Sequence, residues 1–411
     1  MPRRRARPTA FRWVAAALLL ALTGCGVDDP GSEPFAMTTL PPVPAPPGAV
    51  LTVMMWAPLS GSSAYPDLRV VADAFVRTVN SNGGVNGRAL SVLTCDTRGD
   101  SRTAEACARE AVRSKVSAVV GRFAAPGERT LPILAAAGIA DIGPNRPADD
   151  EFSNPISFPI LGGIAVEVTG AAHAAASQNC QRVTMLVQDT LSPAPLTRYA
   201  RAGLATGTGT LTSVAVLPGQ PSGPGPTLAQ TLPAGDCALV IADEETTEYV
   251  LSWVEQNHST QRLFTLGGGY SAQYWDLAPR IFLTEQLPAP DDRVWDEYRG
   301  ALAQATPGAA AVDPNGMAER ATWAALEVFL QVGRHSVTFD AASILSTLRQ
   351  DNTLNTGGIL PPLNFGRPGP LPDMPQLRNP YVTTQQYLNG HLAEIRSGFT
   401  NLTRPLTATP R

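Results

Sequence analysis

The sequence predicts an α/β protein made of two Rossmann-like, doubly wound lobes, each with a parallel sheet. Short continuous apolar runs, typical of strands buried on both faces, alternate with segments whose apolar residues recur every three or four positions, as in amphipathic helices. This alternation runs through four strands and then restarts. About 360 residues follow an N-terminal leader and spacer, enough for two cores of ordinary size. Right-handed crossovers would place helices on both faces of each sheet.

The first lobe is expected to begin with a strand at Leu51–Trp56. A helix should follow over Pro66–Val79 and end in the turn-rich sequence NSNGGVNG at residues 80–87. The next helix, Ser101–Arg113, has Ser101 or Thr103 as its expected cap. The remaining elements of this lobe are predicted as strands at Ala89–Thr94, Val116–Val120 and Ile139–Ile142, and a helix at Gly127–Ala137.

The second lobe repeats the pattern after a helix of small residues at Gly162–Ser177. Later helices are left over to complete the first lobe, and the tail from Gly357, rich in Pro and Gly, holds only short possible strands. Strands are expected at Val183–Val187, Leu211–Val216, Ala238–Ala242, Leu263–Leu266 and Arg280–Thr284, and helices near Pro195–Ala205, Thr227–Leu232, Thr246–His258, Asp291–Ala305, Asn315–Gly333 and Asp340–Arg349.

The N-terminus has the pattern of an export signal. Residues 1–12 carry five arginines and no acid, and residues 11–22 are almost entirely apolar, too short a run to span a bilayer but suited to a signal peptide. The run ends in Leu22-Thr-Gly-Cys25, which resembles the bacterial lipobox, in which the cysteine is diacylated and the leader is cut before it. An ordinary secretory leader with a chance cysteine is the less favoured alternative. We therefore expect a leader at 1–24 and a lasting lipid anchor on Cys25.

Residues 25–49 form a spacer rich in Pro, Gly and small polar residues, expected to be an extended tether. Removing the five leader arginines from the formal charge of −4 leaves about −9, and no basic stripe remains, which argues against nucleic-acid binding and against broad binding to anionic lipid. No later apolar run reaches transmembrane length. The protein is expected to be anchored at the extracellular or periplasmic side of the cell membrane.

Besides Cys25, the chain has four cysteines, an even number that favours disulfides in an oxidising compartment. Three pairings are possible. We favour Cys95–Cys107, a local closure between a strand and the next helix, and Cys180–Cys237, which lie at the starts of two strands that could be neighbours. The four histidines are scattered and none lies in a His-Cys cluster, so no metal or cofactor is expected.

Several stretches resemble the type I periplasmic solute-binding proteins, the group exemplified by the leucine/isoleucine/valine-binding proteins of ABC importers. The likeness runs in order over about residues 50–365. The stretches that carry it are APLSGSSA (57–64), NSNGGVNGRALSVLTCDTRGD (80–100), SKVSAVVGRFAAPG (114–127), NPISFPILG (154–162) and RIFLTEQLP (280–288).

This resemblance implies two lobes joined by three crossovers, with the ligand in the cleft between them. It places the first lobe at 50–158 plus about 285–365, and the second at 159–284 plus about 366–405. Sheet geometry agrees independently, because ligands of open parallel sheets bind beyond the carboxyl ends of the strands.

Candidate ligand residues in the first lobe follow its predicted strands. After the first strand, serine and tyrosine hydroxyls and free N–H groups could hold a carboxylate, with helix capping as the equal alternative. After the third strand, relatives that bind α-amino acids usually place Ser or Thr, where this chain has alanines. After the fourth strand, an arginine could bind an anion or form a surface salt bridge. The candidates are Ser60, Ser62, Ser63, Tyr65, Phe123, Ala124, Asn145 and Arg146.

In the second lobe, Asp189 ends a strand where the family often has an acidic residue. Glu244, next to Glu245, could receive an ammonium group, although the favoured alternative is a helix N-terminus stabilised by acidic residues. Tyr270 follows three glycines and could cover an apolar ligand face. Most of the tryptophans on helical stretches, Trp323 among them, are expected in the core.

The leading interpretation is an uptake receptor that captures a small polar or amino-acid-like solute as a monomer and delivers it to an ABC permease. The alternative is a ligand-sensing regulatory lipoprotein on the same fold. An enzyme is not expected, because the chain has no G-x-S-x-G elbow, H-E-x-x-H motif or P-loop.

Overall fold

A computed structural model describes residues 50–61, 64–123, 127–145, 147–218, 225–267, 277–305, 312–388 and 391–408. The expected leader, the expected lipid site Cys25 and most of the expected tether lie outside these residues. Leu40–Arg411 form one compact unit that contains every described element.

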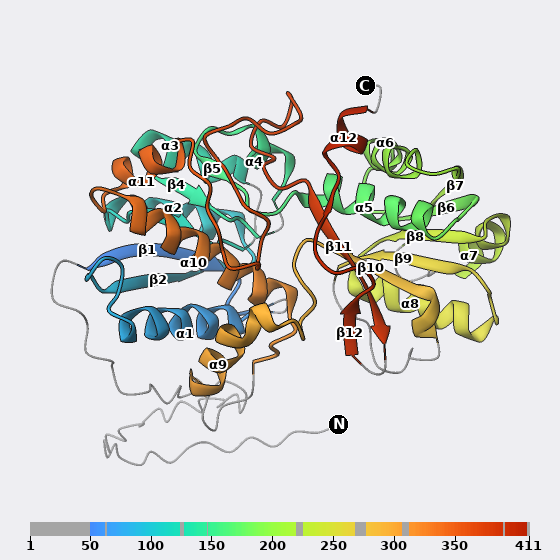
Figure 1. The fold of residues 1–411 in the computed structure, drawn as a ribbon, viewed down its shortest axis with the longest axis horizontal. Helices are drawn as coiled ribbons and strands as arrows, with labels where there is room; N and C mark the ends of the chain where they lie inside the picture. Colours follow the sequence, from blue (N-terminus) through green and yellow to red (C-terminus); the bar gives the residue numbers. More distant parts are fainter. Residues whose placement is uncertain are drawn as a thin grey trace, which may run out of the picture. The chain divides into compact units, whose positions relative to one another are not determined.

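The first sheet is parallel throughout and is covered on both faces (Figure 1). Alternate residues of its first strand point into different cores: Val53 and Met55 pack in one hydrophobic cluster with Phe75, whereas Met54 and Trp56 pack in another with Leu134. The doubly wound arrangement predicted for this lobe is confirmed. Its strands run in the order β2-β1-β3-β4-β5: β1 (Leu51–Ala57), β2 (Leu90–Asp96), β3 (Ala118–Val120), β4 (Ala140–Ile142) and β5 (Ser157–Phe158).

Helices connect these strands, and helices from later in the chain complete the lobe. Trp295, Trp323 and Phe329 lie in the same cluster as Val53, so the chain returns to this core after the second sheet has begun. Trp323 is buried as expected. The helices are α1 (Asp67–Ser81), α2 (Ser101–Arg113), α3 (Leu131–Ala137), α4 (Asp149–Ser153), α9 (Asp296–Ala305), α10 (Met317–His335) and α11 (Ala341–Leu348).

Three local predictions in this lobe are corrected. The cap of α2 is Asp100, whose Oδ1 accepts the Thr103 N–H at 2.9 Å, because Asp100 directly precedes the first helical residue, whereas Ser101 and Thr103 lie within the helix. The helices expected to begin at Gly127 and Asp291 start later, at Leu131 and Asp296. Each is preceded by a short 3-10 turn, at Gly127–Arg129 and Arg293–Trp295.

The second sheet is mixed, which corrects the expectation of a wholly parallel sheet. Strands β6 to β10 are parallel, but β11 runs antiparallel to β10 and β12 antiparallel to β11, while β13 pairs with β11. Their order is β12-β11-β10-β9-β8-β6-β7. The strands are β6 (Arg182–Gln188), β7 (Thr210–Leu217), β8 (Cys237–Ile241), β9 (Arg262–Leu266), β10 (Ile281–Glu285), β11 (Tyr381–Leu388), β12 (His391–Glu394) and β13 (Thr400–Asn401).

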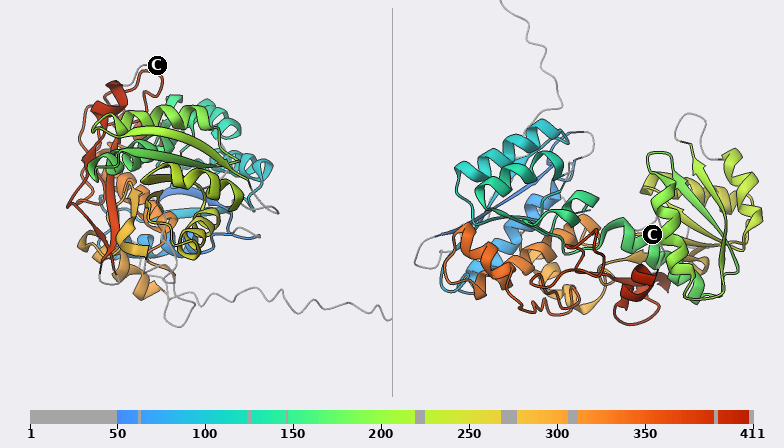
Figure 2. Two further views of the ribbon diagram at one scale, coloured as in Figure 1. Left: turned by 90° about the vertical axis from the view of Figure 1, so that its right-hand side faces the viewer. Right: turned by 90° about the horizontal axis from the view of Figure 1, so that it is seen from above.

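Helices cover both faces of the second sheet (Figure 2). The helices α5 (Gly163–Ser177) and α6 (Pro193–Leu204) share a core with Val183 and Val187, whereas α7 (Gly225–Thr231) and α8 (Glu244–Gln256) share one with Leu186. A short helix, α12 (Thr403–Ala408), packs on α6 and α5. Because a Cβ at Gly203 would lie 2.2 Å from the Thr169 carbonyl oxygen, glycine lets α6 approach α5 closely.

Each lobe contains one disulfide. Cys95–Cys107 joins β2 to α2, and Cys180–Cys237 joins a residue two positions before β6 to the start of β8. Both have a Cα–Cα distance of 5.9 Å. The second bond spans neighbouring parallel strands, since Val183 pairs with Cys237. The pairing favoured from the sequence is therefore the pairing in the structure.

The chain passes between the two sheets at three segments, before α5, after β10 and before β11, and buried amides tie these segments together. The Gly162 N–H donates to Gln286 Oε1, and Gln286 Nε2 donates to Glu167 Oε1 at 2.9 Å. Asn379 Nδ2 donates to the Ile160 carbonyl at 2.7 Å. The connecting segments therefore support one another through hydrogen bonds as well as through the chain.

Candidate ligand site

The loop after β1 is organised by a carboxylate at the end of β2. Asp96 accepts hydrogen bonds from the N–H groups of Leu59 and Arg98, both at 2.9 Å, and from the Ser60 hydroxyl at 2.5 Å. Partial burial acts to raise the pKa of Asp96, but these donors hold it below its ordinary value. Ser60 therefore binds Asp96, and the helix-capping alternative is wrong for it, since α1 has no side-chain cap.

Three of the candidate residues come together beyond the carboxyl ends of β1, β3 and β4. The rings of Tyr65 and Phe123 lie 4.4 Å apart between centroids and are tilted by 49°. Phe123 pairs with Asn145 in an isolated parallel bridge, which continues the sheet past the ends of β3 and β4. Phe123 is buried in the core of the first lobe and Tyr65 is half-buried, so the Tyr65 ring packs on this core and is the more exposed of the two.

The side chain of Asn145 is only 6% exposed, and one end of its amide is bonded. Its Nδ2 donates to the Ala318 carbonyl at 3.1 Å, at the start of α10. Its Oδ1 is buried and has no hydrogen-bond partner within the described residues. An unpaired buried acceptor carries a desolvation cost of roughly 1–3 kcal/mol, so an incoming N–H donor at this point would be favoured.

A buried ion network supports the loops that carry these residues. The Arg122 guanidinium, 3% exposed, pairs with Asp141 at 3.0 Å and with Glu151. Glu151 also accepts the Gly127 N–H at 3.1 Å and the Ala148 N–H at 2.5 Å. Gly127 lies at the end of the loop after β3, and Ala148 lies at the end of the loop after β4. Burial, with repulsion by Asp150 and Asp141, raises the pKa of Glu151 against the attraction of Arg122. The network thus holds both loops to the sheet.

The corresponding edge of the second sheet depends on exposed hydrogen bonds. Gln188, at the end of β6, receives the Asp243 N–H at 2.8 Å and donates to Asp243 Oδ2 at 2.7 Å. Asp243 also caps α8. Asp189 is exposed next to this pair, and Glu244 is exposed in the first turn of α8. Their contact with a ligand stays a prediction.

The other candidate ligand residues, Ser62, Ser63, Ala124, Arg146 and Tyr270, lie outside the described residues, as does the expected lipid site Cys25. Of the described candidates, the structure brings Phe123 against both Tyr65 and Asn145, and it joins Ser60, in the loop after β1, to Asp96 at the end of β2.

Sequence reasoning missed the residues that position this edge. A charged residue inside an otherwise apolar strand run signals a buried ion pair, and both Arg122 in VVGRF and Asp141 in IADIG show it. Asp96 follows an apolar run in the same way. The contact between Asn145 and α10 had no sequence signal, because it joins segments 173 residues apart.

The described residues contain no group of three or more His, Cys, Asp or Glu side chains that could hold a metal ion. None of the described helices is long and apolar enough to cross a membrane.

Comparisons with known proteins agree with this geometry. Several solved structures share the fold over nearly their whole length, although their sequence identity to this chain is low. A substrate-binding periplasmic protein from Ralstonia solanacearum is 19% identical, with 84% of this chain and 99% of that chain covered and a TM-score of 0.64. A fatty acid ABC transporter substrate-binding protein from Thermomonospora curvata is 13% identical, with coverages of 88% and 96% and a TM-score of 0.68.

A third similar structure is the branched-chain amino acid transporter substrate-binding protein LivJ from Streptococcus pneumoniae, in complex with isoleucine. It is 12% identical, with coverages of 86% and 99% and a TM-score of 0.65. No curated protein sequence gives a significant match. A family model described as "Periplasmic binding protein" matches residues 51–372, most of the chain. The chain therefore belongs to the periplasmic binding protein family, with the two-lobed type I fold, and is a binding protein rather than an enzyme.

Proposed function

We propose that this protein is an extracytoplasmic solute-binding lipoprotein that captures a small polar or amino-acid-like ligand between its two lobes and delivers it to an ABC permease. The observation that carries the proposal is the contact of Tyr65, Phe123 and Asn145 beyond the carboxyl ends of the first sheet. This is where ligands of open α/β sheets bind. The isoleucine and fatty acid named for two similar structures support a ligand with an apolar part.

The chemistry of this edge narrows the ligand class. The half-buried Tyr65 ring, packed on Phe123, offers an apolar surface, and Asn145 Oδ1, which has no hydrogen-bond partner among the described residues, offers an acceptor. A ligand with an apolar body and an N–H donor, such as an amide or an amine, would complement both. Closure of the second lobe over the ligand would bring the exposed Asp189 and Glu244 toward its cationic end.

The proposal includes an anchor and a division of the chain. The lipid on Cys25 and the tether at 25–49 would keep the monomeric receptor near its permease. We propose 50–158 with about 285–365 as the first lobe and 159–284 with about 366–405 as the second. The hydrophobic cores support this division, because Trp295 and Phe365 pack with the first sheet and Val382 with the second.

A thermal-shift screen of the unlipidated chain, residues 26–411, tests the function. Amino acids, amides, and short-chain and aromatic acids would be compared, and we expect at least one compound with an N–H donor to raise the melting temperature. The Asn145→Ala variant should need about tenfold more ligand to reach the same shift, because one buried hydrogen bond to the ligand is lost.

Asn257→Ala serves as the matched control, since Asn257 is an exposed residue at the end of α8, where its Nδ2 bonds only the Trp253 carbonyl. It should leave the ligand shift unchanged. If no compound of these classes stabilised the chain, solute capture would be contradicted. Equal shifts in the Asn145 variant and the wild type would show that Asn145 does not contact the ligand.

A further inference from the structure

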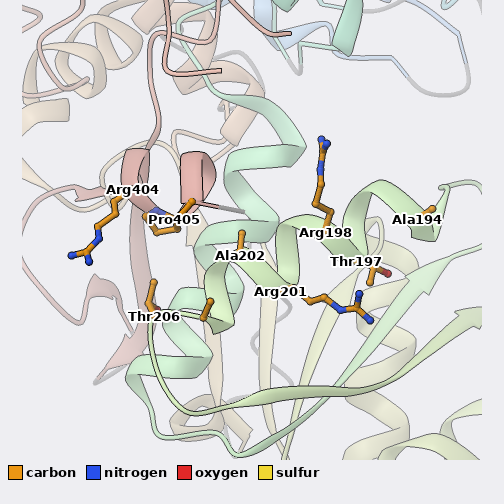
Figure 3. A pocket seen from close by; sticks show the side chains of 10 residues that line it. Ala194, Thr197, Arg198, Arg201, Ala202, Thr206, Arg404 and Pro405 are labelled. Atoms are coloured by element: carbon orange, nitrogen blue, oxygen red, sulfur yellow. The ribbon is translucent and has the colours of Figure 1, made fainter. Parts of the chain in front are cut away.

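A groove lies on the second lobe between α6 and α12, and none of the candidate ligand residues lines it (Figure 3). It has a volume of about 910 Å³. Its floor consists of small apolar residues from both helices, and its rim carries arginine side chains. The lining residues are Ala194, Thr197, Arg198, Arg201, Ala202, Ala205, Thr206, Arg404, Pro405 and Ala408.

The charge of this groove opposes that of the whole chain. The helices α6 and α12 contain three arginines and no acidic residue, in a protein whose acids outnumber its bases. Arg201 and Arg404 are exposed, and no arginine of the groove forms an ion pair with a described residue. Arg198 lies over the ring of Tyr199, at 4.9 Å from its centroid.

The surroundings add to this positive charge on one side and reduce it on another. His173, bonded to Thr206 at 2.8 Å, has a lowered pKa through burial and through repulsion by Arg396, so a fourth arginine is close to the groove. On the other side, an adjoining cavity is lined by the acidic residue Asp373. Arg198 lines both this cavity and the groove.

The three arginines of the groove do not converge on one point. Figure 3 shows Arg404 extending to one side of the floor, while Arg198 and Arg201 extend in different directions on the other. One small anion could therefore engage only one guanidinium at a time. An array of phosphates spread over a surface could engage all three, and the alanine and proline floor would accept the apolar part beneath each phosphate.

We infer that this groove is a docking surface for an anionic phospholipid bilayer, with the arginines on separate headgroup phosphates and the floor against the glycerol and upper acyl region. The inference rests on the proposed function only for the lipid anchor that would keep a membrane within reach. Docking would fix which face of the second lobe turns toward the membrane.

Vesicle co-sedimentation tests this surface directly. The unlipidated chain of residues 26–411 should bind vesicles of mixed phosphatidylglycerol and phosphatidylcholine at low salt, should bind phosphatidylcholine vesicles far less, and should be released by added salt. Each arginine near an anionic surface contributes about fivefold in partitioning, so R198Q/R201Q/R404Q should weaken binding by about 100-fold. The triple lysine variant should keep most of it, because charge is retained.

The matched control removes three charges from one exposed helix of the other lobe, as R102Q/R109Q/R113Q in α2. It should bind as the wild type does. Equal loss in both glutamine variants would overturn the inference in favour of unspecific attraction. Undiminished vesicle binding by R198Q/R201Q/R404Q would also overturn the inference of bilayer docking. An acidic protein would then be the alternative partner for the groove. Because the solute screen uses no vesicles, failure here and failure of the proposed function are separate results.

Discussion

The strand ends of the two lobes are stabilised in different ways. In the first lobe, the loops after β1, β3 and β4 are held by carboxylates, and the central ion network of Arg122, Asp141 and Glu151 is almost fully buried. In the second lobe, the corresponding edge is held by the exposed pair of Gln188 and Asp243. Buried charged groups tolerate little displacement from their partners. Exposed hydrogen bonds of a side-chain amide are readily replaced by hydrogen bonds to water. The first lobe is thus the rigid half of the proposed site and the second the adaptable half.

The largest effect is expected from Arg122→Ala. It leaves two carboxylates buried without their cation, which should lower the free energy of unfolding by about 3–5 kcal/mol. Urea unfolding at neutral pH measures it. Arg109→Ala breaks an exposed pair with Glu105 and should cost less than about 1 kcal/mol. Similar losses in the two variants would contradict the rigid character of the first lobe.

Removal of the disulfides should affect the lobes unequally. Cys180–Cys237 closes a loop with a sequence separation of 57, and Cys95–Cys107 one of 12. Chain entropy gives a loss of about 4 kcal/mol for the first and about 3 kcal/mol for the second. Paired serine variants, compared by thermal unfolding, measure the difference, and the reverse order would show that the entropy of the unfolded chain does not dominate.

A pH-dependent effect is expected in the first lobe at Glu327 of α10. Burial and then repulsion by Glu297 raise the pKa of Glu327 to about 7, against the attraction of Arg334. Since the folded pKa lies above the unfolded one, Glu327 binds its proton more tightly in the folded chain, and its ionisation destabilises the fold as pH rises through about 7. Glu327→Gln should therefore gain about 1–2 kcal/mol at pH 8 and almost nothing at pH 4, below the unfolded pKa, as unfolding at both pH values would show. An equal gain at both would contradict the assignment.

The smallest effect is expected from Gln188→Ala in the second lobe. Both of its bonds to Asp243 are exposed, so the loss in unfolding free energy should be about 0.5 kcal/mol. Chemical denaturation measures this loss. The control in the same lobe is Thr231→Ala, which removes a hydrogen bond from the Thr231 hydroxyl to the Thr227 carbonyl within α7. A loss above about 2 kcal/mol would show that this edge is as rigid as that of the first lobe.

The sequence predicted the strands and helices of the parallel parts well, because their strands are continuous apolar runs. It failed at β11, where YVTTQQYL shows no apolar alternation: Thr383 and Gln385 are buried and donate to the Leu287 carbonyl at 2.9 and 3.0 Å. Polar residues satisfied by a connecting segment cannot be recognised before that segment is placed. The candidate site was predicted to the level of loops, since strand ends are local, but the Asn145–Ala318 contact is set by tertiary packing.

The two disulfides lie at opposite ends of their strands, and this affects when the protein becomes competent to bind. Cys180–Cys237 joins the amino ends of β6 and β8, remote from the ligand edge. Cys95 immediately precedes Asp96, the carboxylate that holds the loop after β1. A newly made chain in a reducing cytoplasm would lack this restraint on Asp96. Ordering of the loop after β1 would then be completed only when Cys95–Cys107 forms in an oxidising compartment.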